Sequence, residues 1–324
     1  MSLSDIHEPR TTSVPWAFVL ALALLSPLFY LSLFFSLLAP LPLLYLHQGT
    51  EKIHLGRKFT FLAIPLGLFL VFLIRGPLPA LGFLLFAALP AWILGEAFFR
   101  KYRVETSVLL TAGCILFATL LIALVVLATM SSTEFVHLTG AMKDQVVQFA
   151  DSLLKGQTGL SEESREQLQK ILENPRVVLW ELPGLFLSSI LLLSAVPAIA
   201  MIRWNPKGFL RRAELSRDTL RRFRTPDWLV WPTLFSVALI IFSIPSLTPV
   251  AQNLLKPLIL IYFFQGMSIL AFFLDSFRSR GTFRILIYMI AVVFLTPMVV
   301  SFGFFDLWFN FRERVKSENK GNTP

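Results

Sequence analysis

Charged residues and cysteine are scarce in this sequence. Of 324 residues, 55% are hydrophobic and only 15% are charged, whereas soluble domains carry about 25% charged residues. The apolar residues form long blocks between short charged connectors, a pattern typical of a chain that crosses a membrane several times. The single cysteine, Cys114, lies inside such a block, so an internal disulfide framework and a thiolate metal cluster are both excluded.

Catalytic and metal-binding motifs are also missing. The sequence has four histidines but no HExxH, no GxSxG, no phosphate-binding GxxxxGK[ST], and no GxGxxG followed by the required acidic residue. His47 and His54 share one connector, where we interpret both as solvated surface residues. We therefore expect a protein that is not an enzyme, with no catalytic residues, no metal and no cofactor.

The apolar blocks predict an all-α fold, a polytopic transmembrane helical bundle of about eight or nine spans. Seven of these blocks are each close to the roughly 20 residues that a helix needs to cross the hydrocarbon layer. These blocks are Phe59 to Ile74, Leu78 to Phe98, Val108 to Ala128, Val177 to Ile202, Leu229 to Ile244, Pro257 to Leu274 and Phe283 to Phe302.

The first apolar run, Val14 to Leu46, is too long for one simple span and contains Pro27, Pro40 and Pro42. An internal proline removes a backbone donor and clashes with the preceding turn. We interpret the run as two short helices bent near Ser26-Pro27, with one long kinked helix as the alternative.

The charged connectors predict the orientation of a single integral membrane domain over residues 1–324. Lys and Arg exceed Asp and Glu by nine, and we assign this excess to cytoplasmic connectors rather than to nucleic-acid binding. The connector 203–227 is strongly basic, so we expect it to be cytoplasmic, with residues 203–224 in contact with anionic lipid headgroups. The polar end of the chain, residues 316–324, is predicted to be disordered.

The long connector 131–175 is the one loop in which acidic residues exceed basic ones, which predicts an extracytoplasmic location. Apolar residues from Phe135 to Leu153 recur at three- and four-residue steps and predict an amphipathic helix. Ser161 followed by two glutamates predicts the start of a second helix, and Asn174-Pro175 predicts its end. We expect this helical pair to lie on the outer surface or to cap the mouth of a cavity.

Polar residues inside apolar blocks are the candidates for a site, because a charge at the centre of a bilayer costs roughly 3 kcal/mol or more. In "YFFQGMSILAFFLDSFRSR", helical spacing places Gln265, Ser268 and Asp275 near one face. Two interpretations stay open: the amide and hydroxyl bridge neighbouring helices, or the seam binds a ligand or ion. In both, we expect Gln265 and Ser268 to face other helices, and Asp275 to pair with Arg278 or Arg280.

The stretch "GFFDLWFNFRERVK" separates rings from charges at helical steps. This division predicts a helix lying in the membrane interface, with its rings among the headgroups and its charges in water. Asp306 and Arg312 have a competing role as a ligand or partner contact.

A family resemblance adds to these predictions. "NLLKPLILIYFFQGMSILAFFLDSFRSRG" with "GFFDLWFNFRER", and "LLAPLPLLYLHQG" near the start, resemble the YybS-like bacterial membrane proteins, an uncharacterised family. That family is similar in layout to the S-components of energy-coupling-factor transporters. The resemblance implies an inner-membrane helical bundle that holds a small solute, although this sequence has more than the six spans of an S-component.

The function expected from these observations is that of a multi-pass protein of the bacterial inner (plasma) membrane that acts as a solute-binding or transport component for a small solute. The candidate ligand or seam residues are Gln265, Ser268, Asp275, Asp306 and Arg312. The alternative is a non-transporting structural or regulatory protein that recruits a membrane or cytoplasmic protein partner through its basic connector.

Overall fold

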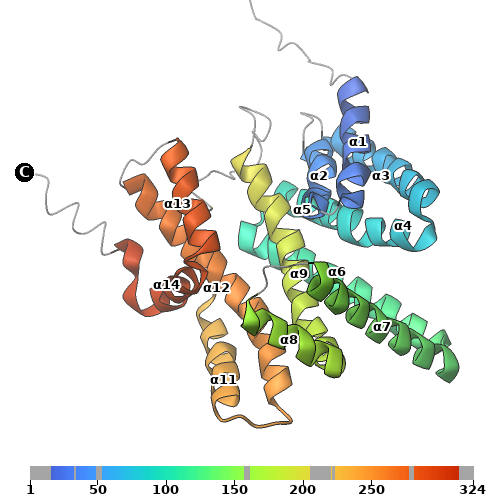
Figure 1. Ribbon diagram of the computed structural model, residues 1–324. Coiled ribbons are helices and arrows are strands. Elements are labelled where there is room, and N and C mark those ends of the chain that lie inside the picture. Colours follow the sequence, from blue (N-terminus) through green and yellow to red (C-terminus); the bar gives the residue numbers. More distant parts are fainter. Residues whose placement is uncertain are drawn as a thin grey trace, which may run out of the picture. The chain divides into compact units, whose positions relative to one another are not determined.

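The computed structural model describes residues 16–32, 34–48, 53–156, 161–204, 220, 223–276 and 281–313 (Figure 1). The described part of the chain is helical and contains no strand, which confirms the predicted all-α class. The helices are α1 (Trp16–Leu31), α2 (Pro40–Gln48), α3 (Ile53–Arg75), α4 (Pro77–Phe83), α5 (Leu89–Phe99), α6 (Val104–Thr129), α7 (Ser132–Gly156), α8 (Glu162–Glu173), α9 (Arg176–Arg203), α11 (Val230–Ile241), α12 (Thr248–Ser276), α13 (Thr282–Val293) and α14 (Thr296–Phe309), with short turns η1 (Ser36–Leu38), η2 (Leu84–Ala88) and η3 (Asp227–Leu229).

Fewer helices are long enough to cross a membrane than the sequence predicted. Among the described residues, five apolar segments qualify, and α13 with α14 makes a sixth if this pair, bent by 92°, counts as one span. The predicted total of eight or nine is therefore not confirmed. The stretches 16–31 and 227–241 are apolar but too short to cross about 30 Å as straight helices, and the predicted span 283–302 is broken between α13 and α14. The five are Leu55–Arg75, Pro77–Phe99, Val104–Thr129, Val178–Arg203 and Thr248–Ser276.

The chain divides into two compact units, which we describe separately. The first contains Met1–Ile115 and Leu193–Leu215, and the second contains Leu116–Leu192 and Ser216–Pro324. Most of the basic connector, residues 205–219 and 221–222, lies outside the described residues, as does the tail 316–324. The lipid contact of that connector and the disorder of that tail stay predictions.

In the first unit, α1 to α5 and the end of α9 enclose a core that includes Leu43, Leu94 and Met201. The bend predicted at Ser26-Pro27 is not there, because α1 continues through Pro27 and the break falls between Leu31 and Pro40. The Ser26 hydroxyl donates to the carbonyl of Ala39 at 2.8 Å. This bond ties the turn before α2 back onto α1.

His47, which we interpreted as a solvated residue, is buried, with 5% of its surface exposed. Its ring packs edge-on against Trp92 with ring centres 5.3 Å apart, and it fills the space that a Cβ atom on Gly95 would need. Burial lowers the pKa of His47 to about 4, with Glu96 opposing and Arg57 reinforcing this shift. The prediction was wrong because a glycine on α5 makes room for an imidazole that is neutral at pH 7.

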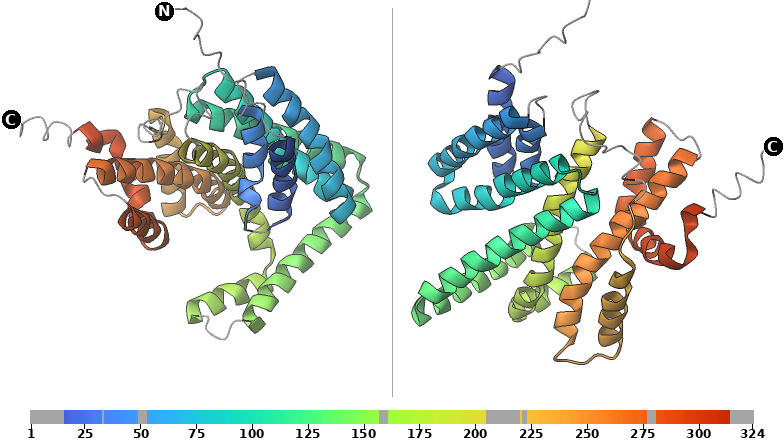
Figure 2. Two further views of the ribbon diagram at one scale, coloured as in Figure 1. Left: turned by 90° about the horizontal axis from the view of Figure 1, so that it is seen from above. Right: turned by 180° about the vertical axis from the view of Figure 1, so that it is seen from behind.

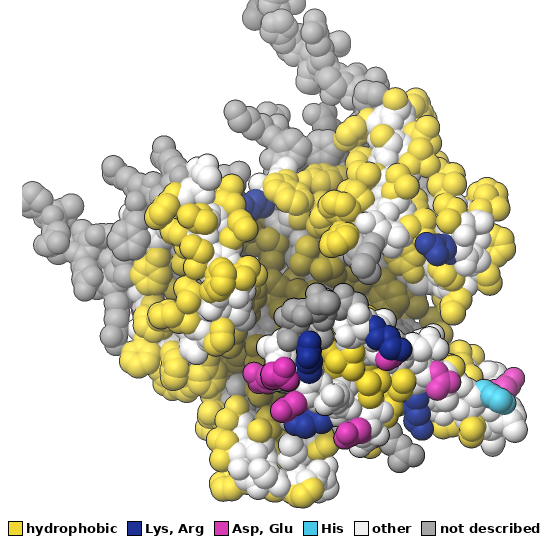
Figure 3. Space-filling model, viewed as in Figure 1, with side chains coloured by type: hydrophobic (Ala, Val, Ile, Leu, Met, Phe, Trp, Pro, Cys, Tyr) yellow, Lys and Arg dark blue, Asp and Glu magenta, His cyan; other side chains and the backbone are white. Residues whose placement is uncertain are grey.

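In the second unit, α7 and α8 confirm the predicted helical pair of the connector 131–175. The Ser161 hydroxyl accepts the N–H of Ser164 at 3.3 Å, and Asn174 caps the other end of α8. Figure 3 shows acidic and basic side chains gathered over these two helices. Their predicted location outside the cytoplasm stays a prediction.

The helices α11, α12 and α14 form the rest of the second unit that matters for the site. Figures 1 and 2 show α11 antiparallel to the first half of α12, and α14 crossing α12. At the crossing, a Cβ atom on Gly266 would lie 2.0 Å from the carbonyl oxygen of Val299, and one on Gly303 would lie 2.0 Å from that of Tyr262. Only glycine fits at either position, so the two backbones approach as closely as small residues allow in membrane helix pairs.

The side chain of Asn253 joins α12 to a turn of α9 that contains Pro183. Its amide oxygen accepts the N–H of Gly184 at 2.6 Å, and its amide nitrogen donates to the carbonyls of Trp180 at 2.6 Å and Pro249 at 2.8 Å. In a regular helix the N–H of Gly184 donates to the carbonyl of Trp180. Asn253 therefore bridges the two backbone groups of α9 that form one turn, as side chains do at helix distortions.

We expect Asn253→Leu to destabilise the protein by about 2–3 kcal/mol, because it removes three hydrogen bonds and leaves backbone groups of α9 without these partners. Thermal unfolding in detergent measures this loss. The control is Gln252→Leu, since Gln252 is the exposed neighbour on the same helix. Equal stability of the two variants would show that Asn253 does not bridge α9.

Candidate functional site

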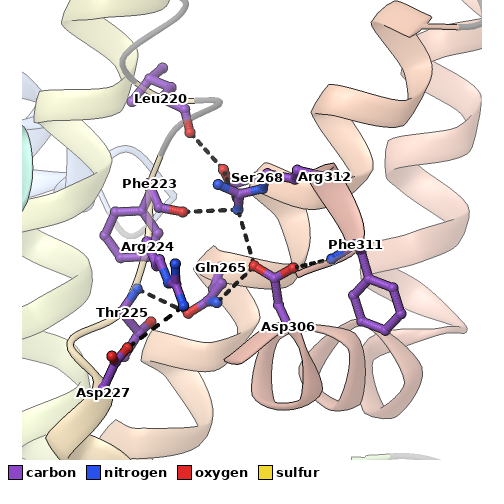
Figure 4. Close-up of polar contacts among 10 residues, drawn as sticks. All are labelled: Leu220, Phe223, Arg224, Thr225, Asp227, Gln265, Ser268, Asp306, Phe311 and Arg312. Atoms are coloured by element: carbon purple, nitrogen blue, oxygen red, sulfur yellow. Dashed lines mark hydrogen bonds and ion pairs between the residues drawn. The ribbon is translucent and has the colours of Figure 1, made fainter. Parts of the chain in front are cut away.

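Four of the five predicted site residues come together in the second unit (Figure 4). Gln265 and Ser268 lie slightly past the middle of α12, and Asp306 and Arg312 lie at and beyond the end of α14. We call these four side chains the polar cluster. Gln265 is fully buried, with Ser268 6% and Asp306 4% exposed, which confirms that Gln265 and Ser268 face protein rather than lipid.

Gln265 stands at the centre of the polar cluster. Its amide oxygen accepts the backbone N–H of Thr225 at 3.0 Å, and its amide nitrogen donates to Asp306 Oδ2 at 3.2 Å. The amide thus uses its acceptor and a donor on two different parts of the chain. A buried amide without such partners would cost several kcal/mol in an apolar environment, about 4–8 kcal/mol on hydrocarbon transfer scales, so these contacts explain how the apolar stretch accommodates it.

Asp306 is held by the turn that ends α14. The helix stops at Phe309, and Asn310 adopts a left-handed backbone with φ of 44°. This turn lets the N–H of Phe311 donate to Asp306 Oδ1 at 3.1 Å. The prediction of one continuous helix across this stretch, with Asp306 in water, is therefore wrong. Its regular spacing suggested that Asp306 faced water, whereas the left-handed turn folds the chain back over a buried carboxylate.

Arg312 follows that turn and reaches into the polar cluster. Its Nη2 atom donates to the carbonyl of Phe223 at 2.9 Å and to Ser268 Oγ at 3.3 Å, and lies 3.9 Å from Asp306 Oδ2. Burial lowers the pKa of Arg312, while Asp306 opposes this shift and Arg224 reinforces it. Because a guanidinium stays charged in proteins, the carboxylate and the carbonyl compensate for its loss of water.

The non-helical stretch at residues 223–226 completes the site. The carbonyl of Phe223 binds Arg312, the N–H of Thr225 binds Gln265, and the carbonyl of Leu220 accepts the Ser268 hydroxyl at 2.8 Å. These residues are the end of the basic connector that precedes α11. The polar cluster therefore links α12 and α14 to the C-terminal end of the 203–227 connector.

Asp275, the fifth predicted residue, lies outside the polar cluster. Its carboxylate forms an ion pair with Arg284 near the start of α13, and Arg284 also contacts the hydroxyl of Tyr288 at 2.9 Å. Arg278 and Arg280, the predicted partners, lie outside the described residues. The sequence predicted an ion pair but not this partner, because Arg284 becomes close only when α13 folds back beside the end of α12.

Several polar contacts were not predicted from the sequence. Asn253 gave a usable signal, since it is an amide in an apolar helix like Gln265. Glu96 lies 3.1 Å from Arg100 one turn later and 2.5 Å from Arg57, and the sequence did not predict the contact with Arg57. The backbone partners of the polar cluster could not be predicted from the sequence, because any residue supplies a carbonyl and nearly every residue an N–H.

The site contains mixed donors and acceptors rather than metal ligands. Among the described residues, no group of three or more His, Cys, Asp or Glu side chains is placed to hold a metal ion. One carboxylate, one guanidinium, one amide and one hydroxyl converge on two non-helical stretches of backbone (Figure 4). Such a set can bind a polar group of a small molecule or clamp a segment of protein.

A comparison with protein families identifies the family. A family model described as "Predicted membrane protein (DUF2232)" matches residues 16–307. The chain belongs to this family. The match includes Gln265, Ser268 and Asp306 and ends before Arg312. No curated protein and no solved structure matches the chain. The description of the DUF2232 family names a membrane protein and assigns no biochemical role to it. The resemblance to YybS-like proteins and to S-components therefore stays a prediction.

Proposed function

We infer that this DUF2232 protein is a multi-pass component of the bacterial inner membrane that binds a small solute for transport and performs no covalent chemistry. The observation that carries this proposal is the buried polar cluster near the middle of α12, a helix of 29 residues. Ionisable residues inside membrane segments are rare and are by default candidates for substrate or ion pathways and ligand counter-ions.

The backbone around the polar cluster supports the same proposal. Transporters bind solutes near the middle of the membrane, where interrupted helices expose backbone groups. Here the chain leaves helical geometry on both sides of Gln265, at residues 223–226 and at Asn310 after the end of α14. Within the hydrocarbon layer, irregular backbone is tolerated only where protein or a polar cavity surrounds it.

The test is to identify small molecules that purify with the protein. Wild type, Gln265→Leu and Arg312→Gln are purified in parallel, checked for a monodisperse folded state, and denatured to release bound molecules for mass spectrometry. We expect at least one compound in wild type that both variants lose at least tenfold. Asp275→Asn is the matched control and should keep it, because Asp275 lies outside the polar cluster. Identical profiles in folded wild type and variants would contradict solute binding at this site.

A second candidate function rests on a different feature of the same contacts. Ser268, Gln265 and Arg312 hold the end of the basic connector, and this favours a regulatory protein that presents the connector to a protein partner. The discriminating variant replaces Arg211, Arg212, Arg221 and Arg222 with glutamine. Loss of one defined cross-linked partner in cells, with the co-purifying solute unchanged, would support recruitment; loss of neither would contradict it.

A further inference from the structure

The hydrogen bonds of the polar cluster leave donors without acceptors. Both carboxylate oxygens of Asp306 and the amide oxygen of Gln265 accept hydrogen bonds. By contrast, Arg312 Nε and the hydroxyl of Thr225 are buried and have no hydrogen-bond partner in the part of the chain that the structure describes. Thr225 is 1% exposed. An unpaired buried polar group costs about 1–3 kcal/mol, so the cluster as described is complementary to a group that supplies acceptors.

The geometry of Arg312 specifies what kind of acceptor fits. Nε and Nη2 form one edge of the planar guanidinium, and this edge binds the two oxygens of a carboxylate or phosphate through parallel hydrogen bonds. In the structure Nη2 donates to the carbonyl of Phe223 at 2.9 Å and to Ser268 Oγ at 3.3 Å, while the neighbouring Nε has no acceptor among the described residues. Protein oxygens therefore already contact Nη2, whereas Nε, the other donor of this edge, is left for an added acceptor.

We propose that the Nε and Nη2 edge of Arg312 binds the carboxylate or phosphate of a small anionic solute, which replaces the carbonyl of Phe223. This inference rests on the proposed function and names its substrate class. Thr225 contributes a further buried hydroxyl, and its backbone N–H donates to the amide oxygen of the neighbouring Gln265. Binding of the anion releases Phe223 from Arg312, so solute binding loosens the end of the basic connector.

The test compares wild type with Arg312→Lys, which keeps the positive charge but loses the paired donors. Thermal unfolding of the purified protein in neutral detergent is measured with 20 mM acetate, succinate or inorganic phosphate, each against chloride at equal ionic strength. We expect at least one oxyanion to raise the unfolding temperature of wild type by 3 °C or more and to leave Arg312→Lys unchanged. Asp275→Asn should preserve the shift, because Asp275 lies outside the polar cluster.

Other outcomes separate the alternatives. Equal shifts in wild type and folded Arg312→Lys, or no shift with any oxyanion, would overturn the proposal. Micelles containing phosphatidylglycerol instead of phosphatidylcholine test a lipid headgroup as the source of the phosphate. An Arg312-dependent shift there, without one from the soluble anions, would overturn the small solute and identify a lipid. A co-purifying solute without an acidic group would refute this inference while leaving the proposed function intact.

Discussion

Gly303→Ala is expected to destabilise the protein by at least about 3 kcal/mol, the upper range for overpacking a tight core. The added methyl group would lie 2.0 Å from the carbonyl oxygen of Tyr262 and 2.9 Å from the backbone nitrogen of Gly266. Both obstacles are backbone atoms of α12, so a change of side-chain rotamer cannot relieve the clash. The helices must separate, and Asp306 on the next turn of α14 then moves away from Gln265.

The matched control for this substitution is Gly113→Ala. Gly113 also lies within a long apolar helix, α6, but a Cβ atom there meets nothing within 4 Å. Alanine stabilises a helix by up to about 1 kcal/mol relative to glycine, so this variant should be neutral or slightly more stable. Similar unfolding temperatures for Gly303→Ala and Gly113→Ala would contradict the close crossing of α12 and α14.

Asp306→Leu is expected to cost about 3–5 kcal/mol, the usual effect of removing one member of a buried ion pair. The substitution leaves the guanidinium of Arg312 without its counter-charge and the amide of Gln265 and the N–H of Phe311 without their acceptor. The loss is measured as the unfolding free energy in detergent, alongside the amount of protein that reaches the membrane.

The control for Asp306 is Asp227→Asn, which removes a carboxylate 3.9 Å from Arg224. The side chain of Asp227 is 74% exposed, and an exposed ion pair of this kind contributes about 0–1 kcal/mol. We therefore expect stability close to that of wild type. A loss at Asp306 no larger than at Asp227 would mean that the carboxylate is not buried among the contacts described.

The sequence predicted the composition of the polar cluster better than its arrangement. The cost of placing Gln265 in apolar surroundings selected it as a candidate, and this physical argument needs no knowledge of the fold; Asp306 was a candidate in a stretch where its charge was expected to face water. The contacts of the polar cluster depend on where the chain turns between its helices. The left-handed Asn310 ends α14 and brings Arg312 back, and hydrophobic periodicity does not detect a single residue of positive φ.

The predicted spans also differ in how well the sequence located them. Long uniform runs such as those of α6 and α9 were found within a few residues of their true ends, because length and hydropathy determine them. The run that contains α13 and α14 was predicted as one helix because it is apolar throughout. The chain breaks between Val293 and Thr296, ahead of Pro297, which lacks a backbone donor, and this break positions Asp306 against α12.

The measurement that tests the polar cluster most directly is a double-mutant cycle on Gln265→Leu and Asp306→Leu. The two side chains hydrogen-bond at 3.2 Å across α12 and α14, so the unfolding free energies of the two single variants should not add. We predict that the double variant is more stable than their sum implies by about 1–3 kcal/mol, within the range seen for residues in direct contact. Additivity to within about 0.5 kcal/mol would show that the residues act independently, and it would contradict a cluster assembled between these helices.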